Sequence, residues 1–533
     1  MKNCSFYACS VRCICTVVLL FASLFVLGQV PVTTYHYDNY RSGLNPNETI
    51  LTPSNVNEAQ FGKLLVLPVT GYVYAQPLYV PNVNINGTLH NVVYTVTEHD
   101  QAYAFDANSG EMLWQTNFLI ANSADETILP ISGYDNGCLA TGSEIGITST
   151  PVIDLASNQI YIVAATKEIV NNNTTFYQRM HVLDISTGVE NLSGPYFGAP
   201  IQAVTPGTGA GSVDGYLTFE PLSENQRAAL TLTNGLVLAS WAAFCDLGDF
   251  HGYVMAFNKT TLQPSGVYVT TPNDADGGIW SSGSGPNVDA AGNIYLPTGN
   301  GGFDANLGGI DFGDSILRLE WAGNQPVVED YFTPWDQATL SQYDTDVGSG
   351  GVLLLPDQPG APYPHLLVQC GKEGTIDLVN RDDMGHYNPD GDTQIVQTLP
   401  FIITGVWGAP VMWNNNIYFG GVFAQLKAFF YDPNAQQIQS QYTSETLETF
   451  TYPGPTPSIS ANGTSNAIVW IFDSFSVLRA YDATNLANEL YNSDQNPGRD
   501  QAGTVLQFAT PTVADGLVFI GAKNEVDVYG LLN

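Results

Sequence analysis

Residues 277–304 read GGIWSSGSGPNVDAAGNIYLPTGNGGFD, and this stretch contains the repeat unit on which most of the chain is built. A Gly285–Pro286 step leads to an apolar position, a turn follows at residues 289–293, and a short strand comes next at residues 294–298. Aspartate, asparagine and glycine favour tight turns, and short apolar runs bounded by such residues indicate strands. The stretch therefore predicts a β-hairpin flanked by glycine-rich loops.

The same unit recurs along the chain at spacings of mostly roughly 30 to 65 residues. Its eight occurrences begin near residues 75, 149, 232, 277, 350, 407, 457 and 509. One sheet cannot bury both of its faces, whereas blades stacked radially bury each sheet against the next. No stretch shows the 3.6-residue period of a substantial helix. We therefore predict an all-β fold, an eight-bladed β-propeller of four-stranded antiparallel blades over residues 71–533. Two β-sandwiches in series are the alternative, and they leave the regular spacing unexplained.

The two ends of this body have a different character. Residues 1–28 resemble a signal peptide, with Lys2 and Arg12 before an apolar run at residues 17–27. This run is short for a membrane span, which needs about 20 apolar residues. We expect a secreted protein, periplasmic if the host is Gram-negative, and a retained anchor is the alternative. Residues 29–70 form an irregular lead-in that we expect to wrap an outer edge of the propeller.

The charge balance excludes some partners. The chain has 50 acidic residues against 15 lysines and arginines, which gives a formal net charge of -35. Such a surface repels phosphate backbones and anionic lipid heads, so we expect neither a nucleic acid nor a membrane surface as partner. Glycosylation sequons, which matter only in a host that glycosylates, occur at Asn47, Asn86, Asn172, Asn173, Asn191, Asn258 and Asn462.

Three cysteines remain after the signal peptide, namely Cys138, Cys245 and Cys370. A secreted protein permits a disulfide. We predict that Cys138 and Cys245 are bonded, because both lie in loop-like sequence. Cys370 lies in an apolar strand and is predicted to be a buried free thiol.

The first repeat closes with AFDANSGEMLW at residues 104–114. This closure resembles the A-x-D-x-x-T-G-x-x-x-W docking motif of the quinoprotein dehydrogenases, which are eight-bladed propellers that bind pyrroloquinoline quinone (PQQ). Partial forms of the motif occur at residues 183–188 and 480–484. The resemblance covers nearly the whole mature chain. In the family the motif's tryptophan packs on the neighbouring blade, which implies this role for Trp114.

The resemblance also implies a site. Gly277–Trp280 matches the family stretch that places a tryptophan under the quinone, and Thr298–Asn300 matches the T-G-N element whose asparagine binds calcium. Carried over one residue at a time, the family roles fall on five side chains. They are Trp280 as the cofactor floor, Lys372 against the quinone oxygens, Asp246 and Asn300 as calcium ligands, and Asp336 as the catalytic base. Asp344 and Asp346 are substitutes for Asp336, because the element around it is shortened. We expect the five to converge at one end of the central channel.

The chain also departs from the family. The quinone roof of two adjacent cysteines followed by V-N-R-G is replaced around Cys138 by a stretch with one cysteine and no arginine. Two functions follow as hypotheses. The first is a monomeric calcium–PQQ dehydrogenase that oxidises an alcohol or a sugar. The second is a cofactor-free propeller scaffold that binds a protein or glycan through its loops.

Overall fold

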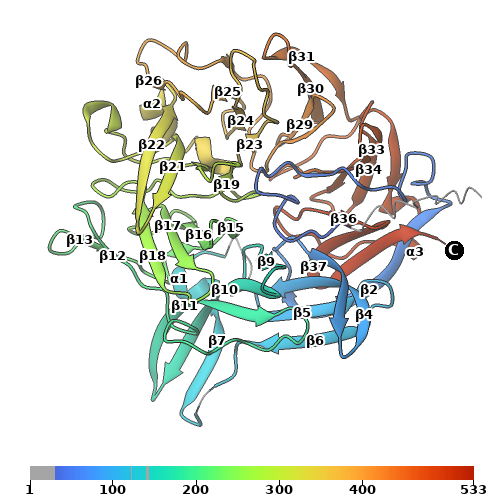
Figure 1. Ribbon diagram of the computed structural model, residues 1–533, viewed down its shortest axis with the longest axis horizontal. Coiled ribbons are helices and arrows are strands. Elements are labelled where there is room, and N and C mark those ends of the chain that lie inside the picture. The colour runs from blue at the N-terminus through green and yellow to red at the C-terminus, as the bar shows by residue number, and fades with distance from the viewer. Residues whose placement is uncertain (1–29, 122, 140–142, 533) are drawn as a thin grey trace, which may run out of the picture.

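The computed structural model describes residues 30–121, 123–139 and 143–532, so the predicted signal peptide at residues 1–28 lies outside the described residues. Eight antiparallel sheets follow one another in chain order around a central axis (Figure 1). This arrangement confirms the eight-bladed propeller and excludes two sandwiches in series. Within the described ranges, no helix is both long enough and apolar enough to cross a bilayer.

The first blade contains β3 (Leu78–Ile85), β4 (Thr88–Thr97), β5 (Gln101–Asp106) and β6 (Met112–Asn117), and the second contains β9 (Val152–Asp154), β10 (Gln159–Val170) and β11 (Asn173–Asp184). The third contains β14 (Glu224–Asn225), β15 (Thr231–Thr233), β16 (Leu236–Ala243), β17 (Tyr253–Asn258) and β18 (Pro264–Val269). The fourth contains β19 (Asn287–Val288), β20 (Ile294–Pro297), β21 (Ile316–Ala322), β22 (Gln325–Thr333) and β26 (His386–Tyr387). The fifth blade contains β23 (Leu353–Leu354), β24 (Leu366–Cys370), β25 (Ile376–Asn380) and β27 (Gln397–Leu399). The sixth contains β28 (Val411–Trp413), β29 (Asn416–Gly420), β30 (Leu426–Asp432) and β31 (Gln437–Glu445). The seventh contains β32 (Ser458–Asn462), β33 (Ser465–Phe472), β34 (Leu478–Asp482) and β35 (Glu489–Asn492), and β1 (Leu44–Asn45) lies beside β32.

A few elements lie outside this pattern. The second sheet is extended by β7 (Glu126–Ser132) and β8 (Glu144–Ile145), and a separate hairpin is formed by β12 (Val204–Pro206) and β13 (Tyr216–Thr218). The helical segments are short, and they are α1 (Gly133–Asn136), α2 (Gln337–Gln342), α3 (Pro497–Asp500), η1 (Ala305–Leu307), η2 (Val347–Ser349) and η3 (Ser493–Gln495).

The eighth blade joins the two ends of the chain. Its strands are β36 (Thr512–Ala514), β37 (Leu517–Leu531) and β2 (Phe61–Tyr72), and β2 pairs antiparallel with β37. A Cβ atom placed on Gly530 would lie 3.0 Å from Leu517 Cδ2, so the two ends of β37 are side by side and the strand folds back on itself. The propeller therefore begins at Phe61, inside the predicted lead-in of residues 29–70.

The first part of the lead-in, residues 32–45, does not lie at an outer edge, and for this part the structure differs from the expectation. Residues 32–45 instead cross one end of the central channel, near the middle of the ring in Figure 1. They exchange hydrogen bonds with the first strand of every blade in ring order, at Tyr79, Ile153, Leu232, Val288, Leu354, Met412, Ile459 and Val513. The physical reason is that an irregular segment needs partners for its own backbone groups, and the strands around the channel supply them.

Arg41 fastens this segment and is fully buried. Its guanidinium donates to two hydroxyls, Thr34 Oγ1 at 2.7 Å and Thr231 Oγ1 at 2.6 Å. It also donates to three carbonyls, those of Tyr35, Leu230 and Pro286. Burial lowers the pKa of Arg41 to about 10. One side chain thus ties the lead-in to the third and fourth blades.

Replacing Arg41 by methionine is expected to lower the free energy of unfolding by about 3 kcal/mol or more, because five acceptors lose their donor and each unpaired buried group costs roughly 1–3 kcal/mol. Denaturant titration of the folded chain measures this change. The exposed cation Lys523 offers a matched control, and Lys523→Met is expected to change the stability by less than about 0.5 kcal/mol. Equal stability of Arg41→Met and the wild type would show that the segment does not fasten the ring.

The docking motif behaves as the resemblance implies. Trp114 Nε1 donates to the Ile185 carbonyl at 2.9 Å. The indole ring packs directly against Gly188, where a Cβ atom would lie only 2.6 Å from the ring. Both residues belong to the turn that closes the second blade. The first blade is therefore locked to its neighbour through apolar burial and one buried hydrogen bond.

Candidate functional site

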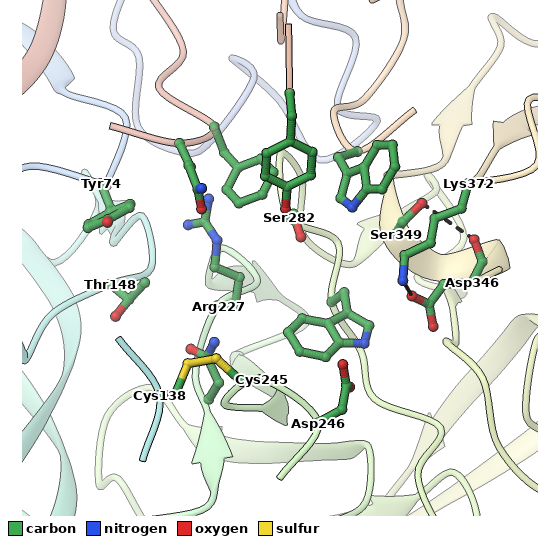
Figure 2. Close-up of a pocket in the computed structure, with 16 residues that line it drawn as sticks. Tyr74, Cys138, Thr148, Arg227, Cys245, Asp246, Ser282, Asp346, Ser349 and Lys372 are labelled. Atoms are coloured by element: carbon green, nitrogen blue, oxygen red, sulfur yellow. Dashed lines mark hydrogen bonds and ion pairs between the residues drawn. A yellow bond between two sulfur atoms is a disulfide. The ribbon is translucent and has the colours of Figure 1, made fainter. Parts of the chain in front are cut away.

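A pocket of ≈ 190 Å³ lies on the axis, at the end of the channel away from the lead-in (Figure 2). Every blade contributes a side chain from the loop before its first strand, and in ring order these include Tyr74, Thr148, Arg227, Trp280, Ser349, Trp407, Tyr452 and Phe508. First strands in a propeller run in the same direction along the axis, so these loops meet at one end. The pocket is thus a product of the repeat.

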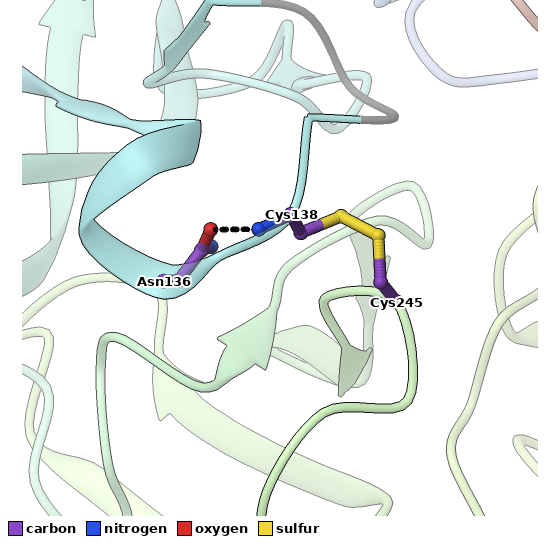
Figure 3. Close-up of a disulfide and its surroundings, with 3 residues drawn as sticks. All are labelled: Asn136, Cys138 and Cys245. Atoms are coloured by element: carbon purple, nitrogen blue, oxygen red, sulfur yellow. Dashed lines mark hydrogen bonds between the residues drawn. A yellow bond between two sulfur atoms is a disulfide. The ribbon is translucent and has the colours of Figure 1, made fainter.

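The wall of the pocket contains the predicted disulfide between Cys138 and Cys245 (Figure 3). It joins residues 107 positions apart, and Cys370 is a free buried thiol. Cys245 and Asp246 both have positive φ, 57° and 50°, and this turn places Asp246 in the pocket lining directly after the disulfide. Figure 2 shows the disulfide on the side of the pocket opposite Lys372 and Asp346.

Two glycines make room for the groups at the centre of the site. A Cβ atom on Gly299 would lie 2.5 Å from Asp346 Oδ1 and 3.0 Å from the Trp280 ring. A Cβ atom on Gly278 would lie 3.2 Å from Trp280 Nε1. A Cβ atom at 2.5 Å from the carboxylate would clash, and one at 3.0–3.2 Å from the indole would be tightly packed. Glycine at these two positions therefore permits the tryptophan and the carboxylate to approach each other.

Asp346 is the most engaged carboxylate in the pocket and is 3% exposed. One oxygen accepts a hydrogen bond from the backbone N–H of Asn300 at 2.7 Å, and the other forms an ion pair with Lys372. Lys372 also pairs with Asp344 at 2.7 Å. Burial by itself would lower the pKa of Lys372, but the two carboxylates outweigh it and raise that pKa, so the ammonium stays protonated.

Asn300 stands behind Asp346 rather than in the pocket lining. Its side-chain Oδ1 is buried and has no hydrogen-bond partner among the described residues. A buried amide oxygen without a partner costs stability unless a ligand satisfies it. Trp280 Nε1 and Asn225 Oδ1, in the pocket lining, lack partners among the described residues in the same way, so the pocket region offers several polar atoms to a ligand.

Asp246 completes a negatively charged region. Burial and the charges of Asp346 and Asp344 raise its pKa to about 6, and Lys372 offsets this only in part. Asp314 lies close by, and its pKa is well above the usual value because of burial and Asp346. In the part of the chain that the structure describes, no three histidine, cysteine or acidic side chains are grouped as a metal site.

No protein-family model and no curated protein matches this sequence. Solved structures do match. The quinohemoprotein alcohol dehydrogenase of Pseudomonas putida HK5 has a TM-score of 0.59 and 14% identity, with 94% of this chain and 80% of that chain covered. The quinohemoprotein alcohol dehydrogenase of Comamonas testosteroni has a TM-score of 0.58, with the same identity and coverage. The chain has the fold of these dehydrogenases. At this identity, the likeness establishes the fold and leaves the activity to be argued from the site.

Asp336 is not in the central pocket, and its prediction as the base at the quinone site is corrected here. It directly precedes α2 and lines a different cavity, whereas its substitute Asp346 lines the central one. The reason is that α2 and the turn after it lie between Asp336 and Asp346 in the chain, so only Asp346 reaches the central pocket. The sequence T-P-W-D at residues 333–336 resembles the family motif, but the chain enters the central pocket only later, at Asp346. Of the five predicted residues, Trp280, Asp246 and Lys372 line one pocket, and Asn300 adjoins it.

Several pocket residues were not predicted, including Arg227, Trp407 and Phe508. Each lies four residues before the first strand of its blade, as do Tyr74, Thr148 and Ser349. Equal offsets within aligned repeats are the signal that would have found them. Arg227 is 8% exposed, lies 4.6 Å from the centre of the Phe508 ring, and forms an ion pair with no carboxylate of the described residues.

Proposed function

We propose that the protein is a secreted, monomeric dehydrogenase that uses calcium and PQQ to oxidise the hydroxyl group of a small alcohol or sugar. The observation that carries this proposal is the placement of Asp346 between Lys372 and Asn300, beside Trp280, at the axis of the propeller. The shared fold with quinohemoprotein alcohol dehydrogenases supports it. If the host is Gram-negative, the compartment is the periplasm.

The residues present fit the calcium ion and the quinone. Asn300 Oδ1 is buried without a partner in the described chain, and Asp246 offers an exposed carboxylate in the same region. Calcium takes six to eight oxygen ligands, so these two residues leave positions for oxygens of the quinone and for water. We therefore expect calcium to bind tightly only together with PQQ. Trp280 offers an aromatic face to a planar ring.

PQQ, when bound beside calcium, would supply the two-electron acceptor for the oxidation. The chain supplies the acid–base and positioning groups. Asp346 is placed to accept the proton of the substrate hydroxyl at a carboxylate oxygen. Lys372 holds a positive charge beside it, and this charge stabilises negative charge that develops nearby.

The missing family roof has a structural counterpart. Adjacent cysteines are absent, but the Cys138–Cys245 disulfide places sulfur in the wall of the same pocket. No arginine follows Cys138, and Arg227 instead brings a guanidinium to the pocket from the third blade. A tricarboxylate such as PQQ favours a pocket with an unpaired cation. The disulfide and Arg227 could thus take the places of the adjacent cysteines and the arginine that this sequence lacks around Cys138.

Reconstitution with PQQ and calcium tests the proposal. Asp246→Ala is expected to abolish calcium-dependent PQQ binding, because the metal loses its carboxylate ligand and calcium then no longer bridges protein and cofactor. Absorption spectroscopy and calcium analysis of the gel-filtered complex measure this loss. Asp382→Ala, an exposed acid on the fifth blade, is the matched control. Wild-type protein that retains neither PQQ nor calcium would exclude the quinoprotein function.

Calcium binding is also expected to depend on pH. The pKa of Asp246 is raised to about 6, and calcium binds only the ionised carboxylate. Affinity for calcium in the presence of PQQ should therefore be constant above about pH 7 and fall as the pH decreases through 6. Calorimetric titration at pH 5, 6, 7 and 8 measures this. An affinity that does not change between pH 5 and 7 would remove Asp246 from the ligand set.

The scaffold hypothesis has one observation in its favour. Phe423 and Phe475 are 69% and 64% exposed, and they occupy the turns between the second and third strands of their blades. Antiparallel topology places these turns at the same end as the loops that line the pocket. Exposed aromatic side chains around a pocket favour stacking against a sugar or an aromatic partner. Glycan binding without PQQ binding would support this second function.

A further inference from the structure

A second cavity of ≈ 250 Å³ lies beside the central pocket, between the end of the fourth blade and the fifth blade. Five carboxylates line it, those of Asp336, Asp346, Glu373, Asp377 and Asp392, and in the described chain no lysine or arginine lines it. Trp335 and Phe401 form part of its wall, and they are 50% and 71% exposed. The cavity therefore combines negative charge with apolar, aromatic surface.

Asp377 is the group that needs an explanation. It lies on β25, is 6% exposed, and its Oδ1 is buried without a hydrogen-bond partner among the described residues. The charged groups around it are Asp392, Glu373 and Asp336, all acidic, and together with burial they raise the pKa of Asp377 to about 8. Burial likewise raises the pKa of Asp392 to about 6. Asp377 is therefore protonated at neutral pH, and its carboxylate form is favoured only when a cation is bound beside it.

We propose that this cavity binds an organic ammonium ion, a short alkylamine or diamine, with its nitrogen at Asp377 and Asp392 and its carbon chain against Trp335 and Phe401. An ammonium group carries three N–H donors and thus satisfies several carboxylate oxygens. Aromatic faces attract such cations by about 0.5–2 kcal/mol. This site does not depend on PQQ or calcium, so it goes beyond the proposed dehydrogenase.

Two observations favour an organic cation over a metal ion. In the described residues no three acidic side chains are close enough to share one ion. The cavity volume of ≈ 250 Å³ also far exceeds the roughly 30 Å³ that one water molecule occupies in the liquid, so a bare ion would leave most of it empty. A chain of four or five carbons takes up far more of this space than a bare ion and covers the apolar wall.

Calorimetric titration of the full chain with 1,4-diaminobutane tests the proposal, with 1,4-butanediol as the uncharged analogue and calcium chloride as the metal probe. We expect one site for the diamine and none for the diol. Binding should be at least about tenfold tighter at pH 8.5 than at pH 6, because Asp377 must release its proton to pair with the ammonium group. The released proton is measured by repeating the titration in buffers of different ionisation enthalpy.

Asp377→Asn keeps the shape of the side chain and is expected to weaken diamine binding at least about tenfold. Asp392→Asn is expected to do the same, and it tests the site independently if the first variant does not fold. Asp382→Asn removes one exposed charge of the fifth blade and should leave the affinity unchanged. Equal weakening by all three variants, heats that the diol reproduces, or calcium that displaces the diamine would each overturn the proposal.

Discussion

Replacing Asp346 by asparagine is expected to lower the rate of alcohol oxidation about 10²- to 10⁴-fold in protein reconstituted with PQQ and calcium, which is the usual contribution of a general base. Asparagine has the same shape and still accepts a hydrogen bond from the Asn300 N–H, so the pocket should stay intact. It cannot accept the proton of the substrate hydroxyl. PQQ binding should therefore persist while turnover is lost.

The measurement is kcat with an artificial electron acceptor, together with the stoichiometry of bound PQQ. The exposed acid Asp382 serves again as control, and Asp382→Asn should have wild-type kcat. Asp336→Asn separates the two candidate bases, because Asp336 lies in the neighbouring cavity. A larger loss of kcat in Asp336→Asn than in Asp346→Asn would assign the base to the residue that the sequence motif favoured.

Removal of the disulfide is the second change with a large expected effect. The double variant Cys138→Ser, Cys245→Ser should lose about 4–5 kcal/mol of unfolding free energy, because the crosslink closes a loop of 107 residues and restricts the unfolded chain. Denaturant unfolding with and without reductant measures this. Reductant should destabilise the wild type to the level of the double variant and leave that variant unchanged.

The disulfide also supports the pocket. Cys245 is followed directly by Asp246, and both lie in a turn of positive φ that the crosslink holds against residue 138. The double variant should therefore also bind PQQ and calcium more weakly than the wild type, even at temperatures where it is fully folded. Unchanged affinity in the folded double variant would mean that the turn holds Asp246 in place without the crosslink.

The local pattern of the chain was enough to predict the fold. Turn residues and apolar strands recur at every blade, and each repeat can bury its sheet only against the next. The same locality explains why Trp280 and Lys372 could be assigned to a common pocket. Trp280 lies in the loop before the first strand of the fourth blade, and Lys372 lies in the turn between the second and third strands of the fifth blade. Antiparallel topology places such loops and turns at the same end of the axis.

Only the tertiary structure decided the positions of long irregular segments, namely the connection from Asp336 to Asp346 and the N-terminal lead-in. The sequence around Asp336 matches a motif, but α2 takes up the chain before the axis, and Asp346 reaches the pocket instead. The lead-in has no period from which to infer a position, and its backbone groups found partners only once eight first strands surrounded them. Local pattern specifies how a segment folds, whereas the free energy of burial and hydrogen bonding across the ring specifies where it lies.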